Sequence, residues 1–264
     1  MVIDAHCHIY PDKIADKASQ NTGRFYDMPM ANNGKLSTLL ENGVKAGIDR
    51  FVVQSVATTP KQVSSINRFI AESVAAYPDK LYGLGTLHPD GVDLEADVNE
   101  LIALGLIGVK LHPDIQQFKL DDYRCLKIYE LCEQHGLPLL IHTGDSRYDF
   151  SNPNRLIPIL DIYKNLQVVG AHFGGWSIWE EASELLKDRE NFYVDTSSSF
   201  YAMDNETVRR IIANYGVDRV IFGTDYPMWN VEDEKERFDS LGYGEEEREK
   251  MLCLNAVRVF GLAD

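Results

Sequence analysis

The feature that most restricts the fold of this 264-residue chain is a regular alternation of apolar strand patterns with helical patterns. Eight short runs have the composition of buried strands, and helical spacing follows each of them; the runs cover residues 2–9, 50–56, 81–87, 107–111, 138–141, 167–171, 192–196 and 220–223. Several runs are continuously apolar, which is typical of parallel strands buried on both faces. Eight strand–helix units in a chain of this length predict an α/β fold, a (β/α)8 TIM barrel.

An open, doubly wound sheet is the alternative architecture, and it would need a glycine-rich phosphate loop after an early strand. The segment Gly83-Leu84-Gly85 lies within a strand pattern and does not complete the GxGxxG sequence. No linker or change in composition divides the chain. We therefore expect a single barrel domain over residues 1–264.

Charge and composition restrict the partners. The formal net charge of −15 argues against a nucleic-acid partner, because phosphate binding needs clustered Lys and Arg. No apolar run reaches the roughly 18–20 residues that cross a bilayer, and a strand pattern that starts at Val2 leaves no room for a signal peptide. The four cysteines form no CxxC pair, which favours reduced thiols. We expect a cytoplasmic protein that acts on a small-molecule substrate, without a nucleic-acid or membrane partner; a homodimer is an open alternative.

The first strand pattern carries two histidines separated by one residue, His6 and His8. Because side chains on a strand alternate between its faces, both imidazoles point to the same side. Two imidazoles on one rigid face are suitable ligands for a borderline metal such as zinc. Asp4 is expected on the same face one step deeper, where it would support the histidines or bond to the neighbouring strand.

Polar residues at the ends of the other strands are informative, because the active site of such a barrel lies at the C-terminal ends of its strands. Six of the seven histidines lie in or at the end of a predicted strand, and only His135 lies in a helix. The polar residues at the later strand ends are His88, Lys110, His112, His142, His172 and Asp225. A distribution unrelated to function would not gather them there.

Two of these residues complete a candidate metal shell with His6 and His8. Three imidazoles and one carboxylate form a usual catalytic metal site, so we add His142 and Asp225 as ligands. A buried Asp225 would be costly unless it were paired or bound to a cation. His172 could be a further ligand or a general acid–base, and we favour the second role, with Asp225 also taking part in proton transfer.

Motifs over the whole chain resemble the amidohydrolase superfamily, in particular its amidohydrolase-related (amidohydrolase 2) branch, which is related to aminocarboxymuconate-semialdehyde decarboxylase. They are Asp4-Ala5-His6-Cys7-His8, Gly108-Val109-Lys110-Leu111-His112-Pro113, His142-Thr143-Gly144, His172-Phe173-Gly174-Gly175, Gly223-Thr224-Asp225-Tyr226-Pro227 and residues 255–262. The resemblance implies a distorted TIM barrel with one divalent metal, usually zinc. It also implies the same four ligands, with His172 above the metal.

Four further residues are candidates for substrate binding. Arg147, after strand 138–141, and Arg24 could each hold a substrate carboxylate, and Trp176 could form the wall for a planar substrate. Arg24 lies in the polar segment 10–35, which we expect to be a long functional loop. Lys110 could bind the substrate, or bridge two metals as a carboxylated lysine does in other amidohydrolases. The resemblance favours a single metal.

A metal in this shell would activate a water molecule. Our main prediction is therefore a hydrolase that acts on a small carboxylate-bearing amide, lactone or ester. The alternative is a decarboxylase that removes CO2 without oxidation from an unsaturated or aromatic acid. A catalytically silent metal-binding scaffold is a third reading, and the presence of both His172 and Asp225 argues against it.

Overall fold

The computed structural model describes residues 1–262, and its strands close into a parallel barrel. The strands pair in the order β1-β2-β3 in one sheet and β4 through β9 in the other, always in parallel. Their bounds are β1 (Ile3–His8), β2 (Arg50–Gln54), β3 (Leu81–Gly83), β4 (Gly85–Thr86), β5 (Val109–Leu111), β6 (Leu139–Ile141), β7 (Val168–Gly170), β8 (Phe192–Asp195) and β9 (Val220–Ile221). This architecture confirms the predicted (β/α)8 barrel.

Two junctions turn these sheets into one barrel of eight strands. Only Leu84 separates β3 from β4, and its amide donates to the Val53 carbonyl while the Gly85 amide donates to Gly108 on the other side, so β3 and β4 act as one strand. At the other junction, between the first and last strands, the Ala5 amide lies 3.0 Å from the Phe222 carbonyl. Hydrogen bonding therefore continues around the whole barrel.

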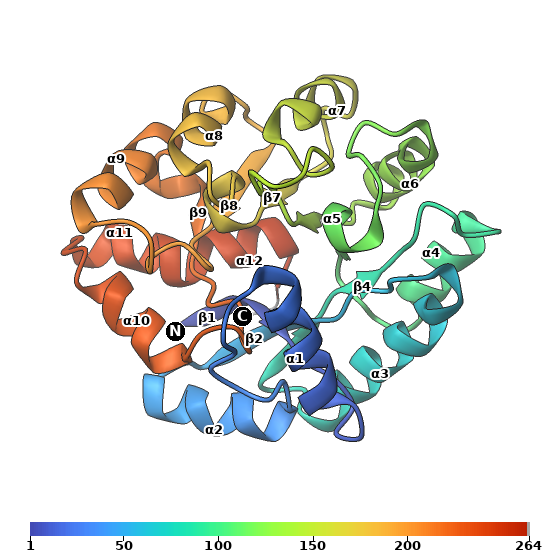
Figure 1. Ribbon diagram of the computed structural model, residues 1–264, viewed down its shortest axis with the longest axis horizontal. Coiled ribbons are helices and arrows are strands. Elements are labelled where there is room, and N and C mark those ends of the chain that lie inside the picture. The colour runs from blue at the N-terminus through green and yellow to red at the C-terminus, as the bar shows by residue number, and fades with distance from the viewer. Residues whose placement is uncertain (263–264) are drawn as a thin grey trace.

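Helices surround the strands as an outer ring (Figure 1). The α-helices are α1 (Ala15–Tyr26), α2 (Leu36–Ala46), α3 (Val63–Ala76), α4 (Leu94–Ala103), α5 (Pro113–Gln116), α6 (Leu126–His135), α7 (Leu156–Ile162), α8 (Trp179–Leu186), α9 (Asn205–Tyr215), α10 (Val231–Asp239), α11 (Glu245–Glu249) and α12 (Asn255–Phe260). Short 3-10 turns are η1 (Pro60–Gln62), η2 (Tyr123–Cys125), η3 (Pro153–Arg155), η4 (His172–Gly174) and η5 (Val217–Arg219), and η6 (Lys250–Leu254) is a π-helical segment. Among the described residues, no helix is both long enough and apolar enough to cross a membrane.

The N-terminal end of the barrel is filled by the last helix. Ile3, Ala5 and Val52 point into the barrel and pack in one cluster with Ala256 and Phe260 of α12. An apolar plug at this end leaves the C-terminal ends of the strands as the accessible end, as expected for an enzyme of this fold.

The segment 10–35 is not the long loop that we expected, because it contains α1. The helix turns small residues inward: its buried positions are Ala15, Ser19 and Gly23, four residues apart. Helices are recognised in a sequence by a stripe of large apolar residues, and α1 has no such stripe on its buried face. In Figure 1 this helix lies across the barrel rather than in the outer ring.

One extra residue in β1 corrects a second expectation. Asp4 pairs with Phe51 and Cys7 with Val53, so three steps along β1 match two steps along β2. Such a bulge turns the following side chains toward the other face of the strand. Ala5 and His6, which lie between the two paired residues, therefore both reach the barrel interior, and Asp4 does not share a face with His6. The Asp4 carboxylate accepts hydrogen bonds from the amide and hydroxyl of Thr224 on the neighbouring segment, which is the second of the two roles expected for it.

Asn67 of α3 stabilises the interrupted strand, and its loss should destabilise the barrel. Its buried side chain accepts from the Thr86 amide (2.7 Å) and donates to the Thr86 carbonyl (3.1 Å). Asn67→Ala would leave both groups without these partners, and we expect the free energy of unfolding to fall by about 2–4 kcal/mol. Urea denaturation monitored by circular dichroism measures this free energy of unfolding. Gln134→Ala, at an exposed position of α6, is the control and should change stability by less than about 0.5 kcal/mol; equal effects of both changes would contradict this role of Asn67.

Candidate active site

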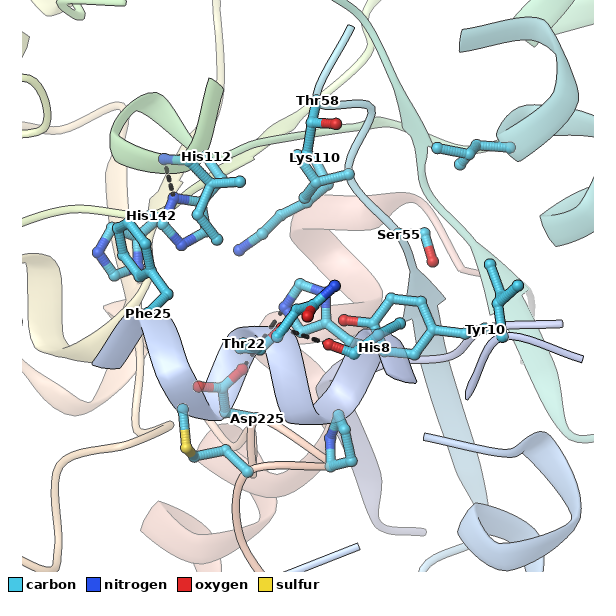
Figure 2. A pocket seen from close by; sticks show the side chains of 18 of the residues that line it. His8, Tyr10, Thr22, Phe25, Ser55, Thr58, Lys110, His112, His142 and Asp225 are labelled. Carbon is cyan, nitrogen blue, oxygen red and sulfur yellow. Dashed lines mark hydrogen bonds and ion pairs between the residues drawn. The ribbon is translucent and has the colours of Figure 1, made fainter. Parts of the chain in front are cut away.

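A cavity of about 570 Å³ opens at the C-terminal end of the barrel, beneath α1. Its polar wall contains every residue of the predicted metal shell, together with Lys110 and His172. Its other walls come mainly from α1, from the segment between β2 and α3 and from the start of α3, and they are largely apolar, with Ile66 and Phe69 of α3 among them. Figure 2 shows Lys110 and Asp225 reaching into this space from different sides. A volume of this size is typical of a small-molecule site.

Three predicted ligands lie close enough together to bind one ion. The Nε2 atoms of His6 and His8 are 3.1 Å apart, and Asp225 Oδ1 lies 3.4 Å and 3.5 Å from them. Nitrogen and oxygen ligands about 2.1 Å from a tetrahedral ion lie roughly 3.4 Å from one another. The donor atoms and their spacing therefore fit a divalent metal.

Asp195 fixes the orientation of His6, and the sequence analysis did not identify it. Its Oδ2 lies 2.7 Å from His6 Nδ1, and both side chains are buried. A hydrogen on Nδ1 held by this carboxylate leaves the lone pair on Nε2, which faces His8 and Asp225. The available signal was an aspartate at the end of an apolar strand pattern, which was also the argument for Asp225.

Asp195 also orients the predicted acid–base residue. Its second oxygen accepts from the His172 backbone amide at 3.0 Å and from the Ser197 amide at 3.0 Å. The His172 ring is held at Nδ1, 3.0 Å from the Ser197 carbonyl and 2.9 Å from its hydroxyl. Its Nε2 therefore lies on the side of His142, whose Nδ1 is 2.9 Å away.

His142 lies in a second cluster of possible ligands. Its Nε2 is 3.4 Å from Asp114 Oδ2, and its ring stacks on His112 with 4.0 Å between centroids. These three residues form a separate group of close ligand atoms, and His142 is not part of the group formed by His6, His8 and Asp225. Its role as the fourth ligand thus stays a prediction. Asp114 was not identified from the sequence.

Strained backbone is concentrated at the site. His172 and Asp225 both have positive φ, 60° and 62°, and so does Ser198, at 46°. Residues other than glycine adopt this region only when their surroundings impose it, and such residues cluster at functional sites. Gly223 meets a related constraint, because a Cβ there would come within 2.9 Å of the His6 Cβ.

Burial shifts the titration of the groups in the cavity. It raises the pKa of Asp225, and a hydrogen bond from Ser198 opposes the shift. It lowers the pKa of Lys110, whose Nζ lies 3.2 Å from His6 Nε2. It also lowers the pKa of His172 to about 3, so this imidazole is neutral. Asp225, with a pKa raised to about 7, and Lys110, with a pKa lowered to about 8, are therefore the groups that can exchange a proton near neutral pH.

The structure does not bring the two predicted arginine clamps to the cavity. Arg147 donates to both oxygens of Asp145 (2.9 and 2.7 Å) and to the Phe25 carbonyl of α1 (2.9 Å). Arg24 is exposed on α1 and donates to Asn21. Neither arginine lines the cavity, and their assignment as carboxylate ligands finds no support in this geometry. Both were chosen from proximity in sequence, which does not report which way a long side chain turns.

The other two substrate-binding candidates do lie at the site. Lys110 lines the main cavity and is fully buried. Trp176 lines a smaller adjoining cavity, which His142, His172 and Asp225 also line. Their contacts with a substrate stay predictions.

A parallel barrel with histidine and aspartate ligands at the C-terminal ends of its strands is the arrangement of a metal-binding barrel enzyme. A sequence profile described as Amidohydrolase matches residues 3–262, and the chain therefore belongs to the amidohydrolase family. Its membership confirms the resemblance noted in the motifs.

The curated relatives that match the chain include gamma-resorcylate decarboxylases. The chain is 28% identical to a gamma-resorcylate decarboxylase of Polaromonas sp. over 123 residues, 39% of this chain and 37% of that protein. Its aligned part thus spans little more than a third of that relative.

Solved structures resemble the chain over nearly its full length. An uncharacterised TIM-barrel protein of Bordetella bronchiseptica shares 25% identity and a TM-score of 0.82, covering 98% of each chain. A dihydroxybenzoic acid decarboxylase of Polaromonas sp. with bound manganese and the inhibitor 2-nitroresorcinol has 17% identity and a TM-score of 0.74, covering 99% of this chain and 97% of that one. At 17% identity, the similarity to the decarboxylase structure shows a shared fold.

Removing the carboxylate behind His6 should weaken metal binding without removing a ligand. Asp195→Asn can no longer accept a hydrogen bond at both oxygens, so the His6 ring loses its fixed tautomer. We expect metal affinity to fall about 10- to 100-fold, measured by competition with a chromophoric chelator. Asp239→Asn, in an exposed ion pair on α10, should leave the affinity unchanged. Unaltered affinity in Asp195→Asn would show that His6 does not depend on this contact.

Proposed function

We propose that this protein is a metal-dependent decarboxylase, which releases CO2 without oxidation from an unsaturated or aromatic carboxylic acid. The sequence alone favours the hydrolase reading, but the gamma-resorcylate decarboxylases among the relatives and the decarboxylase among the similar structures support its alternative. The observation that carries the proposal is that a neutral His172 and Asp225 line the same cavity, whose other walls beneath α1 are largely apolar.

An apolar cavity assists this reaction more than it assists hydrolysis. Loss of CO2 disperses the charge of a carboxylate, so surroundings that solvate the carboxylate poorly favour its breakdown. The walls of this cavity include Ile66, Phe69 and Phe25, which offer no hydrogen bonds to an acid group. Hydrolysis, by contrast, needs a water molecule in the site.

His172 is suited to manage the proton. The neutral imidazole accepts the proton of the substrate acid group. The bond between the carboxyl carbon and its neighbour then breaks, CO2 leaves, and the electron pair stays on the remaining carbon. His172 returns the proton to that carbon, and the balance is one acid converted into one CO2 and one C–H bond. Asp195 and Ser197 keep the ring in position throughout.

His6, His8 and Asp225 would hold the metal, with His142 as the proposed fourth ligand. When bound, the metal supplies positive charge that anchors a substrate oxygen. The ligand types suit zinc, which is our proposal, although manganese is present in the Polaromonas structure. Plasma spectrometry of the purified protein identifies the metal and its stoichiometry.

The reaction class can be tested directly. We expect labelled CO2 from carboxyl-labelled hydroxybenzoic or unsaturated acids, and loss of that activity after chelation. The double variant His6→Ala, His8→Ala should lose both metal and activity while its circular dichroism keeps the barrel signal. A panel of lactones, amides and esters is tested in parallel. Turnover of that panel without CO2 release would restore the hydrolase reading, and metal binding without any turnover would favour a scaffold.

His172→Asn separates proton transfer from metal binding. The change removes the imidazole while Asp195 and the predicted ligands remain, so metal content should stay near that of the wild type. We expect kcat to fall about 10²- to 10⁴-fold, the usual range for a general acid–base. If the variant loses its metal, His172 is a ligand instead.

A further inference from the structure

Tyr26, in the last turn of α1, carries a hydroxyl group whose hydrogen is free to bind a ligand in the cavity. We propose that Tyr26 is a hydrogen-bond donor that holds an anionic oxygen of the substrate, either a carboxylate or a phenolate oxygen. The inference rests on the proposed function for the presence of an acid or phenol in the cavity. The new element is a substrate contact from α1, the helix that covers the cavity.

The direction of the hydrogen follows from the contacts of His112. The Tyr26 oxygen lies 2.7 Å from His112 Nε2. At the other side of the ring, Nδ1 accepts a hydrogen bond from the Ile115 amide at 3.3 Å, where it caps α5. A nitrogen that accepts a hydrogen bond has its lone pair free of a proton, so the hydrogen of the His112 ring is on Nε2. His112 therefore donates to the Tyr26 oxygen.

A phenol that accepts from His112 must direct its own hydrogen elsewhere. Among residues 1–262, His112 is the one hydrogen-bond partner found for the Tyr26 hydroxyl. The residue lines both the main cavity and the smaller cavity shared with His142, His172 and Asp225. An acceptor for this hydrogen can therefore be a substrate oxygen close to the proposed reacting groups.

The Tyr26 ring is held in place before any ligand arrives. It packs edge-on against Trp176 and Phe25, with centroids 5.2 and 4.9 Å away. The Arg147 guanidinium lies 5.4 Å from the Tyr26 centroid and binds the Phe25 carbonyl, which ties the end of α1 to Asp145. Arg147 thus positions a donor for the substrate instead of binding the substrate itself. A donor already oriented loses little entropy on binding.

The chemistry of this donor favours an anionic acceptor. Burial raises the pKa of Tyr26, so the group stays a neutral donor. A hydrogen bond to an ionised oxygen is roughly twice as strong as one to a neutral oxygen. A hydroxyl donor on the cavity wall therefore binds carboxylates and phenolates more strongly than neutral carbonyl compounds.

Binding measurements test the proposal without requiring turnover. Three probes are titrated into the metal-loaded protein by calorimetry: 2,6-dihydroxybenzoate, benzoate and resorcinol. Tyr26→Phe keeps the ring and removes the donor. We expect this variant to bind the probes that carry the recognised oxygen with an affinity about 10- to 100-fold lower than that of the wild type. Tyr148→Phe is the matched control, because Tyr148 stacks on Phe25 but does not line the cavity, and it should change none of the affinities.

The three probes identify the oxygen. A loss confined to benzoate and 2,6-dihydroxybenzoate assigns the carboxylate, whereas a loss confined to resorcinol and 2,6-dihydroxybenzoate assigns the phenol oxygen. His112→Phe keeps a ring against His142 but removes the donor to Tyr26, and its effect should not add to that of Tyr26→Phe in the double variant. Additive effects would mean that His112 and Tyr26 act separately.

Two results would overturn the proposal: a Tyr26→Phe protein that binds all three probes as tightly as the wild type, or a wild type that binds none of them. Failure of the proposed function is a different result. A protein that binds acids through Tyr26 but releases no CO2 would retain this inference and remove the decarboxylase.

Discussion

The site depends on one buried carboxylate, that of Asp195. One of its oxygens holds the His6 ring and the other holds the backbone of His172, so a single side chain sets a predicted metal ligand and the predicted proton-transfer group at once. It can do so because β8 lies next to β7 and the carboxyl ends of parallel strands meet at one end of the barrel. The rest of the arrangement follows from that proximity: the ligand cluster, the strained turn at His172 and the cavity above them.

The elements that repeat in the chain could be predicted from the sequence. Period-two alternation correctly put His6 and His8 on one side, and barrel topology brought Asp225 within 3.5 Å of both. A helix at the position of α2 is also legible in the sequence, because its apolar spacing and the glycine after it are local signals. The burial of the strands could also be predicted, because it depends only on their apolar composition.

Other features depend on contacts between distant residues and could not be read from spacing. The bulge in β1 is a property of its pairing with β2, and it moved Asp4 to another face. Arg147 follows β6 in sequence, but Asp145 and the Phe25 carbonyl satisfy its guanidinium. α1 lacks a large apolar stripe because its buried face consists of small residues, of which Gly23 lies against Met28 and Met30. Asp195 had the same local signal as Asp225, and only its distance from His6 distinguishes a supporting carboxylate from a ligand.

The first and last strands of the barrel meet where the predicted metal ligands lie. His6 and His8 belong to the first strand, and Asp225 follows the last; the Asp225 amide binds the His6 carbonyl and the His8 amide binds the Tyr226 carbonyl. These are among the least local contacts in the chain, and the entropy of closing so long a loop must be overcome before they form. An ion bound by residues on both sides of this seam would act as a cross-link between the two ends of the polypeptide. Metal supply would then affect how readily the barrel closes during folding, as well as what it catalyses afterwards.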